Sequence, residues 1–230
     1  MVQESPVTLR VKFKKLGRLA YISHLDLVRT MTKVVTRAKL PLYYTEGFNP
    51  KPKMTFAAPL SIGTESLCEY MDIRLIKRAD ENEVLESLNR NLTEEMAAVS
   101  AYYPESKLTS LKWIDYKILI NTNSQSERLA ESINEALNKS EILIERKNKR
   151  GEEVSVDIAP LIHKAQCEYK EGRIEIRATL SAAQDSFLNP ERIITLLESE
   201  CKILSGESLL EEHYSIMRER AYFDDMRDFS

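Results

Sequence analysis

Apolar and polar residues alternate one by one near the start of the chain. Residues 7–14 read Val-Thr-Leu-Arg-Val-Lys-Phe-Lys, and this period of two predicts a β-strand with one apolar and one basic face. A second alternating stretch predicts a strand over about 67–76. Shorter strands are expected near 54–58 and 98–103.

After the first strand, apolar residues recur at spacings of three and four, which is typical of a helix. This helix is predicted over 24–38, because Ser23 and Asp26 form a capping box at its start and Pro41 follows its end. A second helix is expected over 80–92. The first half of the chain therefore has the order β-α-β-β-α-β.

The second half repeats this order of elements, although no direct sequence repeat links the two halves. Helices are expected at 127–137 and 190–203, and strands at 116–121, 142–146, 154–162, 165–169, 174–180 and 213–222. The sequence thus predicts an α+β fold of two tandem ferredoxin-like halves, residues 1–106 and 107–230.

The chain has 230 residues, of which 43% are hydrophobic and 30% charged, as expected for a folded protein with a real core. It contains no run of about 18 to 20 uncharged apolar residues, and its first residues do not form a signal pattern. We therefore expect a cytoplasmic protein with no membrane partner.

The cysteines, Cys68, Cys167 and Cys201, are far apart in the sequence. Metal and iron–sulfur sites need closely spaced ligands, and the sequence has neither a cysteine cluster nor a glycine-rich phosphate loop. The thiols are expected to be small buried groups in a reducing compartment. No metal and no cofactor are expected.

The net charge of −3 conceals an uneven distribution. Residues 1–60 carry eleven lysines and arginines and three acidic residues, whereas 61–230 carry 22 and 33. The basic side chains of the first strand, the first helix and the loop 47–53 are Arg10, Lys12, Lys14, Arg29, Lys33, Arg37, Lys51 and Lys53. If they converge on one patch, it can bind a nucleic acid backbone. The alternative is a set of solvated faces without a ligand.

His24 is the candidate catalytic residue. At a helix start the positive end of the dipole favours the neutral imidazole, which can accept a proton. His24 can then act as a general base or position a phosphate. The alternative is a structural hydrogen bond at the helix entrance.

Glu69 stands where the second long strand calls for an apolar side chain. It is expected either to reach water past the end of the sheet, which we favour, or to be buried against Arg18 or Lys53. Glu69 and Asp72 do not share a face of a regular strand, which argues against a paired-acid mechanism.

Several of these residues stand in recognisable motifs. These are residues 21–27 (Tyr-Ile-Ser-His-Leu-Asp-Leu), 47–53 (Gly-Phe-Asn-Pro-Lys-Pro-Lys), the stretch 59–73 and a more degenerate block at 156–162. Together they resemble the radical SAM-linked family of domains of unknown function, found alone or joined to the carboxyl side of a B12-binding radical SAM protein. The matching residues, to which the resemblance assigns no roles, are Ser23, His24, Asp26, Gly47, Asn49, Pro50, Glu69, Tyr70 and Asp72.

The resemblance implies a partner enzyme that generates the radical, and the family's association with RNA-processing genes implies RNA, or an RNA-bearing particle such as the ribosome, as the substrate. The first hypothesis is therefore an accessory module, without activity of its own, that presents RNA to a separate radical SAM enzyme. Its expected binding residues are Arg10, Lys12, Lys14, Arg18, Ser23, Asp26, Arg29, Phe48, Asn49, Lys51, Lys53, Glu69, Tyr70 and Asp72.

Two other hypotheses stay open. The expected architecture is similar to that of the CRISPR repeat-RNA endonucleases, which keeps open a metal-independent ribonuclease that uses His24 with Tyr21 or Tyr70. The third is a plain protein interaction scaffold, which predicts no salt-sensitive binding of nucleic acid.

Overall fold

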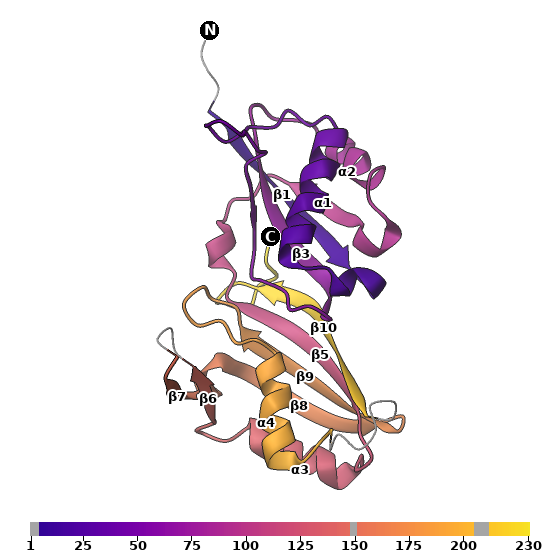
Figure 1. Ribbon diagram of the computed structural model, residues 1–230, viewed down its shortest axis with the longest axis vertical. Helices are drawn as coiled ribbons and strands as arrows, with labels where there is room; N and C mark the ends of the chain where they lie inside the picture. Colours follow the sequence, from indigo (N-terminus) through magenta and orange to yellow (C-terminus); the bar gives the residue numbers. More distant parts are fainter. Residues whose placement is uncertain (1–4, 148–150, 205–211) are drawn as a thin grey trace. The chain divides into compact units, whose positions relative to one another are not determined.

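The computed structural model describes residues 5–147, 151–204 and 212–230 (Figure 1). These residues form two compact units. Unit 1 runs to Leu111 and also contains Asp228–Ser230, and unit 2 is Lys112–Arg227. The last residues of the sequence therefore belong to the first unit.

Unit 1 has the predicted order β-α-β-β-α-β. Its elements are β1 (Val7–Lys15), α1 (His24–Arg37), β2 (Met54–Phe56), β3 (Glu65–Leu75), α2 (Glu81–Asn89) and β4 (Ala98–Tyr102), with short 3-10 helices at Gly17–Tyr21 and Glu94–Met96. The strands lie in the order β4-β1-β3-β2, and each neighbouring pair is antiparallel. This arrangement is ferredoxin-like, as predicted.

Unit 2 repeats the topology. Its main elements are β5 (Trp113–Asn121), α3 (Glu127–Leu137), β8 (Ile162–Lys170), β9 (Arg173–Ser181), α4 (Glu191–Cys201) and β10 (His213–Tyr222). The order β10-β5-β9-β8 places the strands as in unit 1. The α+β fold of two ferredoxin-like halves is confirmed.

Between α3 and β8, unit 2 carries an additional hairpin of β6 (Leu143–Lys147) and β7 (Glu153–Asp157). The single strand expected over 154–162 is therefore wrong. Asp157 ends β7, because its carboxylate accepts the N–H groups of Ile142 (2.8 Å) and Ala159 (3.0 Å) and so bends the chain. A 3-10 helix, Ala159–Leu161, follows with Pro160 in its first turn.

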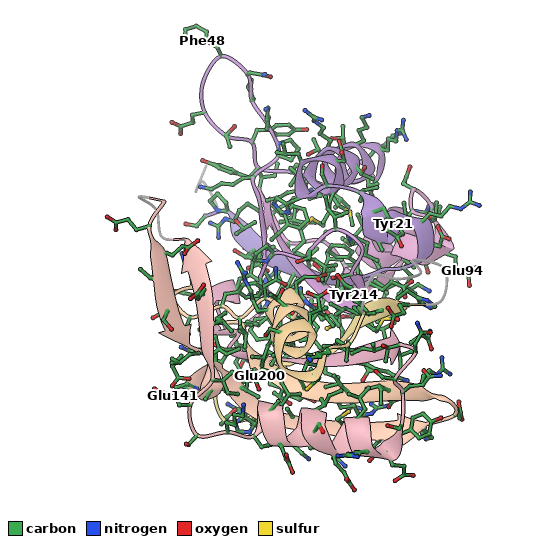
Figure 2. The ribbon with its side chains drawn as sticks, turned by 60° about the horizontal axis from the view of Figure 1, so that its bottom comes forward. Tyr21, Phe48, Glu94, Glu141, Glu200 and Tyr214 are labelled. Atoms are coloured by element: carbon green, nitrogen blue, oxygen red, sulfur yellow. The ribbon has the colours of Figure 1, made fainter. Side chains whose placement is uncertain are left out.

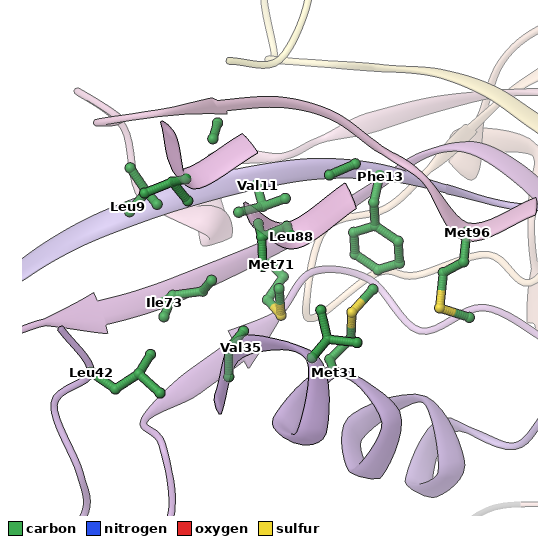
Figure 3. Close-up of a cluster of buried hydrophobic side chains, with 14 of the residues drawn as sticks. Leu9, Val11, Phe13, Met31, Val35, Leu42, Met71, Ile73, Leu88 and Met96 are labelled. Atoms are coloured by element: carbon green, nitrogen blue, oxygen red, sulfur yellow. The ribbon is translucent and has the colours of Figure 1, made fainter. Parts of the chain in front are cut away.

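The core of unit 1 lies between one face of the sheet and the helices α1 and α2 (Figure 3). Leu9, Val11 and Phe13 alternate along β1 and point to this core, where they meet Met31 and Val35 of α1. The even-numbered residues of β1 consequently point to the opposite face of the sheet. This alternation decides where each candidate side chain lies.

Candidate functional site

Arg10 is not a surface residue. Its side chain is 0% exposed, because Nε and Nη2 donate to the two carboxylate oxygens of Asp72 at 2.7 and 3.1 Å. The β1–β3 register places the two residues opposite each other, which allows this two-bond pairing. The expectation that Arg10 projects into solvent from a basic strand face is wrong.

A short segment covers this ion pair, and we call Asp228–Ser230 the strap. The ring of Phe229 lies 4.8 Å from the Arg10 guanidinium and 5.0 Å, edge to face, from the ring of Tyr70. The carbonyl of Ser230 accepts from Arg10 Nη1 (3.2 Å) and from the Ser106 hydroxyl (2.8 Å). The strap therefore occupies the face of the unit 1 sheet that the helices leave open.

Tyr70 belongs to the same buried group. Its hydroxyl donates to the Phe229 carbonyl at 3.1 Å. Burial, with smaller contributions from neighbouring groups such as Cys68 and Tyr102, raises the pKa of Tyr70 far above its usual value. Tyr70 is thus a neutral hydrogen-bond donor at physiological pH.

Lys12 and Lys14 share this face and are partly exposed. The Lys12 ammonium lies 5.8 Å from the centre of the Tyr70 ring. We call the whole set the platform. The register of β1, β3 and β4 places Arg10, Lys12, Tyr70, Asp72, Arg74 and Tyr102 on one face, and Lys14 follows Lys12 by two residues on β1.

A second group of chemically active residues lines a small pocket on the helix side of the sheet. The pocket has a volume of about 10 Å³, close to the smallest cavity that holds one water molecule. Its wall includes Lys15, Ser23, His24, Phe56, Pro59 and Glu69. Two of the sequence motifs, 21–27 and 59–73, thus contribute to one pocket.

Glu69 is buried in this pocket, with 6% of its surface exposed. The favoured expectation, that it reaches water at a strand end, is therefore wrong. The cation that lines the same pocket is Lys15, which is 2% exposed and donates to the Ala20 carbonyl at 3.1 Å. Arg18 and Lys53, the partners considered from the sequence, are both exposed.

Lys15 was not among the candidates, although the sequence contained a signal for it. It falls on the same parity of β1 as Leu9, Val11 and Phe13, just as Glu69 falls on the apolar parity of β3. Opposite charges on the core faces of two strands are expensive to bury alone. Such a pair of misplaced charges therefore predicts that both strands contribute to one polar pocket.

His24 begins α1 and stands at the pocket. Its ring packs edge to face on Phe56, with the ring centres 5.6 Å apart, and the residue remains exposed. Tyr70 points to the platform, on the other face of the sheet, because it is the cross-strand partner of Lys12. The proposed pairing of His24 with Tyr70 is therefore wrong.

Ser23 caps the start of α1 as predicted, and Asp26 bonds its hydroxyl in return. The Ser23 hydroxyl accepts the Asp26 N–H at 3.1 Å and donates to the Asp26 carboxylate at 2.7 Å. The bond that the Ser23 hydroxyl donates, and then the contact with Arg29 at 3.2 Å, hold the pKa of Asp26 below its usual value. Ser23, Asp26 and Arg29 thus stabilise the helix start at which His24 is held.

The loop with the basic motif is an ordered projection, which we call the arm (Tyr43–Lys53, Figure 2). Backbone bonds join its two sides, from Thr45 N–H to the Lys51 carbonyl (2.8 Å) and from Lys53 N–H to the Tyr43 carbonyl (2.9 Å). Phe48 is fully exposed at the tip, beside Asn49. Gly47 has φ of +119°, which residues with a side chain rarely adopt.

The three basic sources do not form one patch. Arg29, Lys33 and Arg37 lie on α1, on the core side of the sheet, while Arg10, Lys12 and Lys14 point to the opposite face. The expectation of a single convergent surface is therefore wrong. What unit 1 offers instead is the arm, the platform and the pocket as separate features.

Among the described residues, no group of three or more histidine, cysteine or acidic side chains is arranged to hold a metal ion. Within the same part of the chain, none of the helices combines the length and the apolar character needed to cross a bilayer. In the ranges that the structure describes, Cys68, Cys167 and Cys201 form no disulfide, and burial raises the pKa of Cys167 to about 12.

The fold and these features define an α+β protein of two ferredoxin-like units with polar sites in the first. The chain belongs to the family described as "Uncharacterized protein conserved in bacteria (DUF2344)", whose model matches residues 8–190. A search of curated proteins found no match.

Three solved structures are similar to the chain in part. A chain of "Crystal Structure of a Cbf5-Nop10-Gar1 Complex" matches 93% of this chain at 10% identity with a TM-score of 0.49, and this chain spans 48% of that one. An unknown protein from Galdieria sulphuraria (11% identity, 93% and 99% coverage, TM-score 0.27) and DyPB from Rhodococcus jostii RHA1 (9%, 94% and 91%, 0.21) are further matches.

Proposed function

We propose that this protein is a cytoplasmic RNA-binding accessory module that acts with a separate radical SAM enzyme, and that the arm is its RNA contact. The observation that carries the proposal is the fully exposed Phe48 at the tip of the arm. The Phe48 side chain is 112% exposed, so it buries no apolar surface against the rest of unit 1. Its side chain is available for a ligand.

The chemistry of the arm suits single-stranded nucleic acid. Proteins that bind such strands combine aromatic rings, on which bases stack, with cations that follow the backbone. Lys51 and Lys53 are exposed on the returning side of the arm, and Tyr44 is 42% exposed beside them. Glu46 is the acidic residue among them, so the arm is net positive.

The arm is also preorganised. Arg74 N–H donates to the Lys53 carbonyl (3.0 Å) and Tyr43 N–H to the Arg74 carbonyl (2.8 Å), which fastens both sides of the arm to β3. Pro50 and Pro52 restrict the backbone further. Binding through a rigid arm loses less conformational entropy than binding through a floppy loop.

A partner enzyme follows from the resemblance to radical SAM-linked domains. The described thiols do not form a cluster with other metal-binding side chains, so we assign the radical chemistry to the partner. Substrate presentation by unit 1 is the part that this chain contributes.

The test is a binding titration with a fluorescent single-stranded RNA of about 12 nucleotides, long enough for one binding surface. Phe48→Ala is expected to weaken binding by about tenfold or more, as loss of one stacked base predicts. Tyr169→Ala on β8, another exposed aromatic residue, is the control and should bind as the native chain does. Equal affinities for Phe48→Ala and the native chain would refute the arm as the RNA contact.

Charge is tested separately. Lys51→Ala/Lys53→Ala should lower the slope of log affinity against log salt by about 1.4, measured between about 50 and 200 mM. The control is Lys164→Ala/Lys170→Ala, which removes two exposed lysines of β8. RNA binding that does not depend on salt, or no binding at all, would favour the interaction scaffold.

One observation favours a second function, a metal-independent ribonuclease. His24 is exposed at the wall of a pocket that also contains the buried Lys15 and Glu69, and an exposed histidine can act as a general base toward an RNA hydroxyl. This hypothesis predicts RNA cleavage in excess chelator that His24→Ala abolishes. Intact RNA after incubation with the native chain would eliminate it.

A further inference from the structure

The platform has the composition of a nucleic acid site, although the strap now covers it. Its cations are Arg10, Lys12, Lys14 and Arg74, and its acidic residue is Asp72. Two tyrosines, Tyr70 and Tyr102, lie among them on β3 and β4. The open sheet face of a ferredoxin-like fold is a recurrent place for RNA bases to stack on aromatic side chains.

The strap fills this face with groups that resemble those of a nucleotide in shape and hydrogen-bonding character. The Phe229 ring is planar and lies against the Arg10 guanidinium (4.8 Å) and the Tyr70 ring (5.0 Å). Bases stack on guanidinium planes, so Arg10 is the stacking surface of this slot, and the Tyr70 ring, at 87° to the Phe229 ring, lines its side. Phe229 is 4% exposed, so the slot that holds its ring is closed from solvent.

The polar contacts of the strap also resemble those that a nucleotide can make. Carbonyl oxygens of the strap accept from the Tyr70 hydroxyl (3.1 Å), Arg10 Nη1 (3.2 Å) and the Ser106 hydroxyl (2.8 Å). Asp228 adds an exposed negative charge next to a face that is otherwise positive. A nucleobase with its phosphate offers a planar ring, acceptor atoms and an anion in the same way.

We infer that the platform is a second RNA site, which takes one unpaired base in the place of the Phe229 ring, and that the strap is its internal competitor. The inference rests on the proposed function, because its ligand is single-stranded RNA. It goes further in assigning a second RNA-binding surface. Loss of Phe48 should weaken RNA binding, whereas loss of the strap should strengthen it.

The Arg10–Asp72 pair makes the slot persistent. Four of the five bonds that Arg10 donates go to Asp72 and Ser106, and one goes to the strap. Departure of the strap therefore leaves the guanidinium plane held by Asp72 and Ser106. The cation then stays in the position that it has against the Phe229 ring, where an incoming base can meet it.

Release of the strap has a measurable consequence. When a site is open for only a fraction of the time, its apparent affinity falls by that fraction. A strap that is closed nine-tenths of the time predicts that its removal tightens RNA binding about tenfold. The experiment uses the full chain, Phe229→Ala and a chain that ends at Arg227, with the same fluorescent RNA as above.

A peptide of the sequence 222–230 supplies the strap in trans. It should displace RNA from the chain that ends at Arg227 and should not affect the arm. Thermal unfolding and circular dichroism establish that each variant is folded. If both variants unfold, Tyr70→Phe keeps the ring, removes the bond to the Phe229 carbonyl, and should still tighten RNA binding.

The outcomes separate the two proposals. Tighter binding by the strap variants, reversed by the peptide, supports the second site. Unchanged or weaker binding by folded strap variants, while Phe48→Ala weakens binding, overturns the second site and leaves the arm in place. No RNA binding by the native chain and by every strap variant overturns both.

Discussion

The two units have the same sheet topology but differ in the balance of charge on the face of the sheet that the helices leave open. In unit 2, Lys117 pairs with Glu175 (3.2 Å), and Arg177 pairs with both Glu175 (2.8 Å) and Glu219 (3.3 Å). Cations and acids there neutralise one another on the surface. The platform of unit 1 has an excess of cations and an aromatic covering segment instead.

The connection from the first helix to the second strand also differs between the units in charge and in aromatic content. Unit 1 places the arm there, with exposed Phe48 and two lysines. Unit 2 places the β6–β7 hairpin there, and residues 141–157 contain no aromatic residue and five acids against four bases. The fold thus occurs once with an excess of cations and an exposed aromatic arm, and once with its charges neutralised, and for this reason we place the proposed RNA contact in unit 1.

Arg10 and Arg177 give the sharpest test of this difference. Arg10→Ala leaves the carboxylate of Asp72 without its buried partner, and should lower the free energy of unfolding by roughly 3 to 5 kcal/mol. The side chain of Arg177 is 59% exposed, so Arg177→Ala should lower the free energy of unfolding by less than about 1 kcal/mol. Urea unfolding of both variants measures the two values, and similar losses would break the comparison.

The scaffolds themselves should respond alike. Asn89 of α2 bonds both backbone groups of Ala98, at 2.8 and 3.0 Å, and Asn134 of α3 bonds both backbone groups of Cys167, at 2.8 and 2.7 Å. Each Asn→Ala variant leaves a partly buried N–H and carbonyl without that partner, at about 2 kcal/mol. Unequal midpoints in urea would show that one unit depends on this bridge more than the other.

The helix caps provide a smaller matched pair. The Ser23 hydroxyl accepts from Asp26 N–H (3.1 Å) at the start of α1, and the Ser126 hydroxyl accepts from Leu129 N–H (3.2 Å) at the start of α3. Ser→Ala at either position should cost about 1 kcal/mol. Thermal unfolding is the measurement, and a loss at Ser126 alone would contradict equal capping.

The smallest effect is expected when unit 2 is made to resemble unit 1 in charge alone. Glu175→Gln/Glu219→Gln removes both acids that pair with Arg177, so the face becomes positive. Without an exposed aromatic arm, RNA binding should strengthen by about twofold or less. A gain as large as the loss in Phe48→Ala would mean that charge, not stacking, determines affinity.

Much of the fold was predictable because its signals are local. The alternation of residues 7–14 and the capping box at Ser23 predict β1 and the start of α1 from neighbouring residues alone. The division of the strand expected over 154–162 could not be predicted, because the Asp157 carboxylate accepts the N–H of Ile142, fifteen residues earlier. Tertiary contacts override local propensity there.

The candidate site was less predictable for the same reason. Nothing near Arg10 in the sequence announces that Asp72, 62 residues later, and the strap will bury it. Whether Phe48 projects or folds back also depends on the bonds that fasten the arm to β3. The Lys15–Glu69 pocket is the exception, since strand parity alone marks both residues as misplaced.

The burial of Lys15 has a consequence for chemical footprinting. An ammonium group without solvent access reacts slowly with acylating reagents, whereas the exposed lysines Lys51 and Lys53 are open to them. Mass spectrometry of the lightly acylated chain should find the arm labelled early and Lys15 spared. Late modification of Lys15 would then report the opening of unit 1, so a single amine serves as an intrinsic reporter of its unfolding.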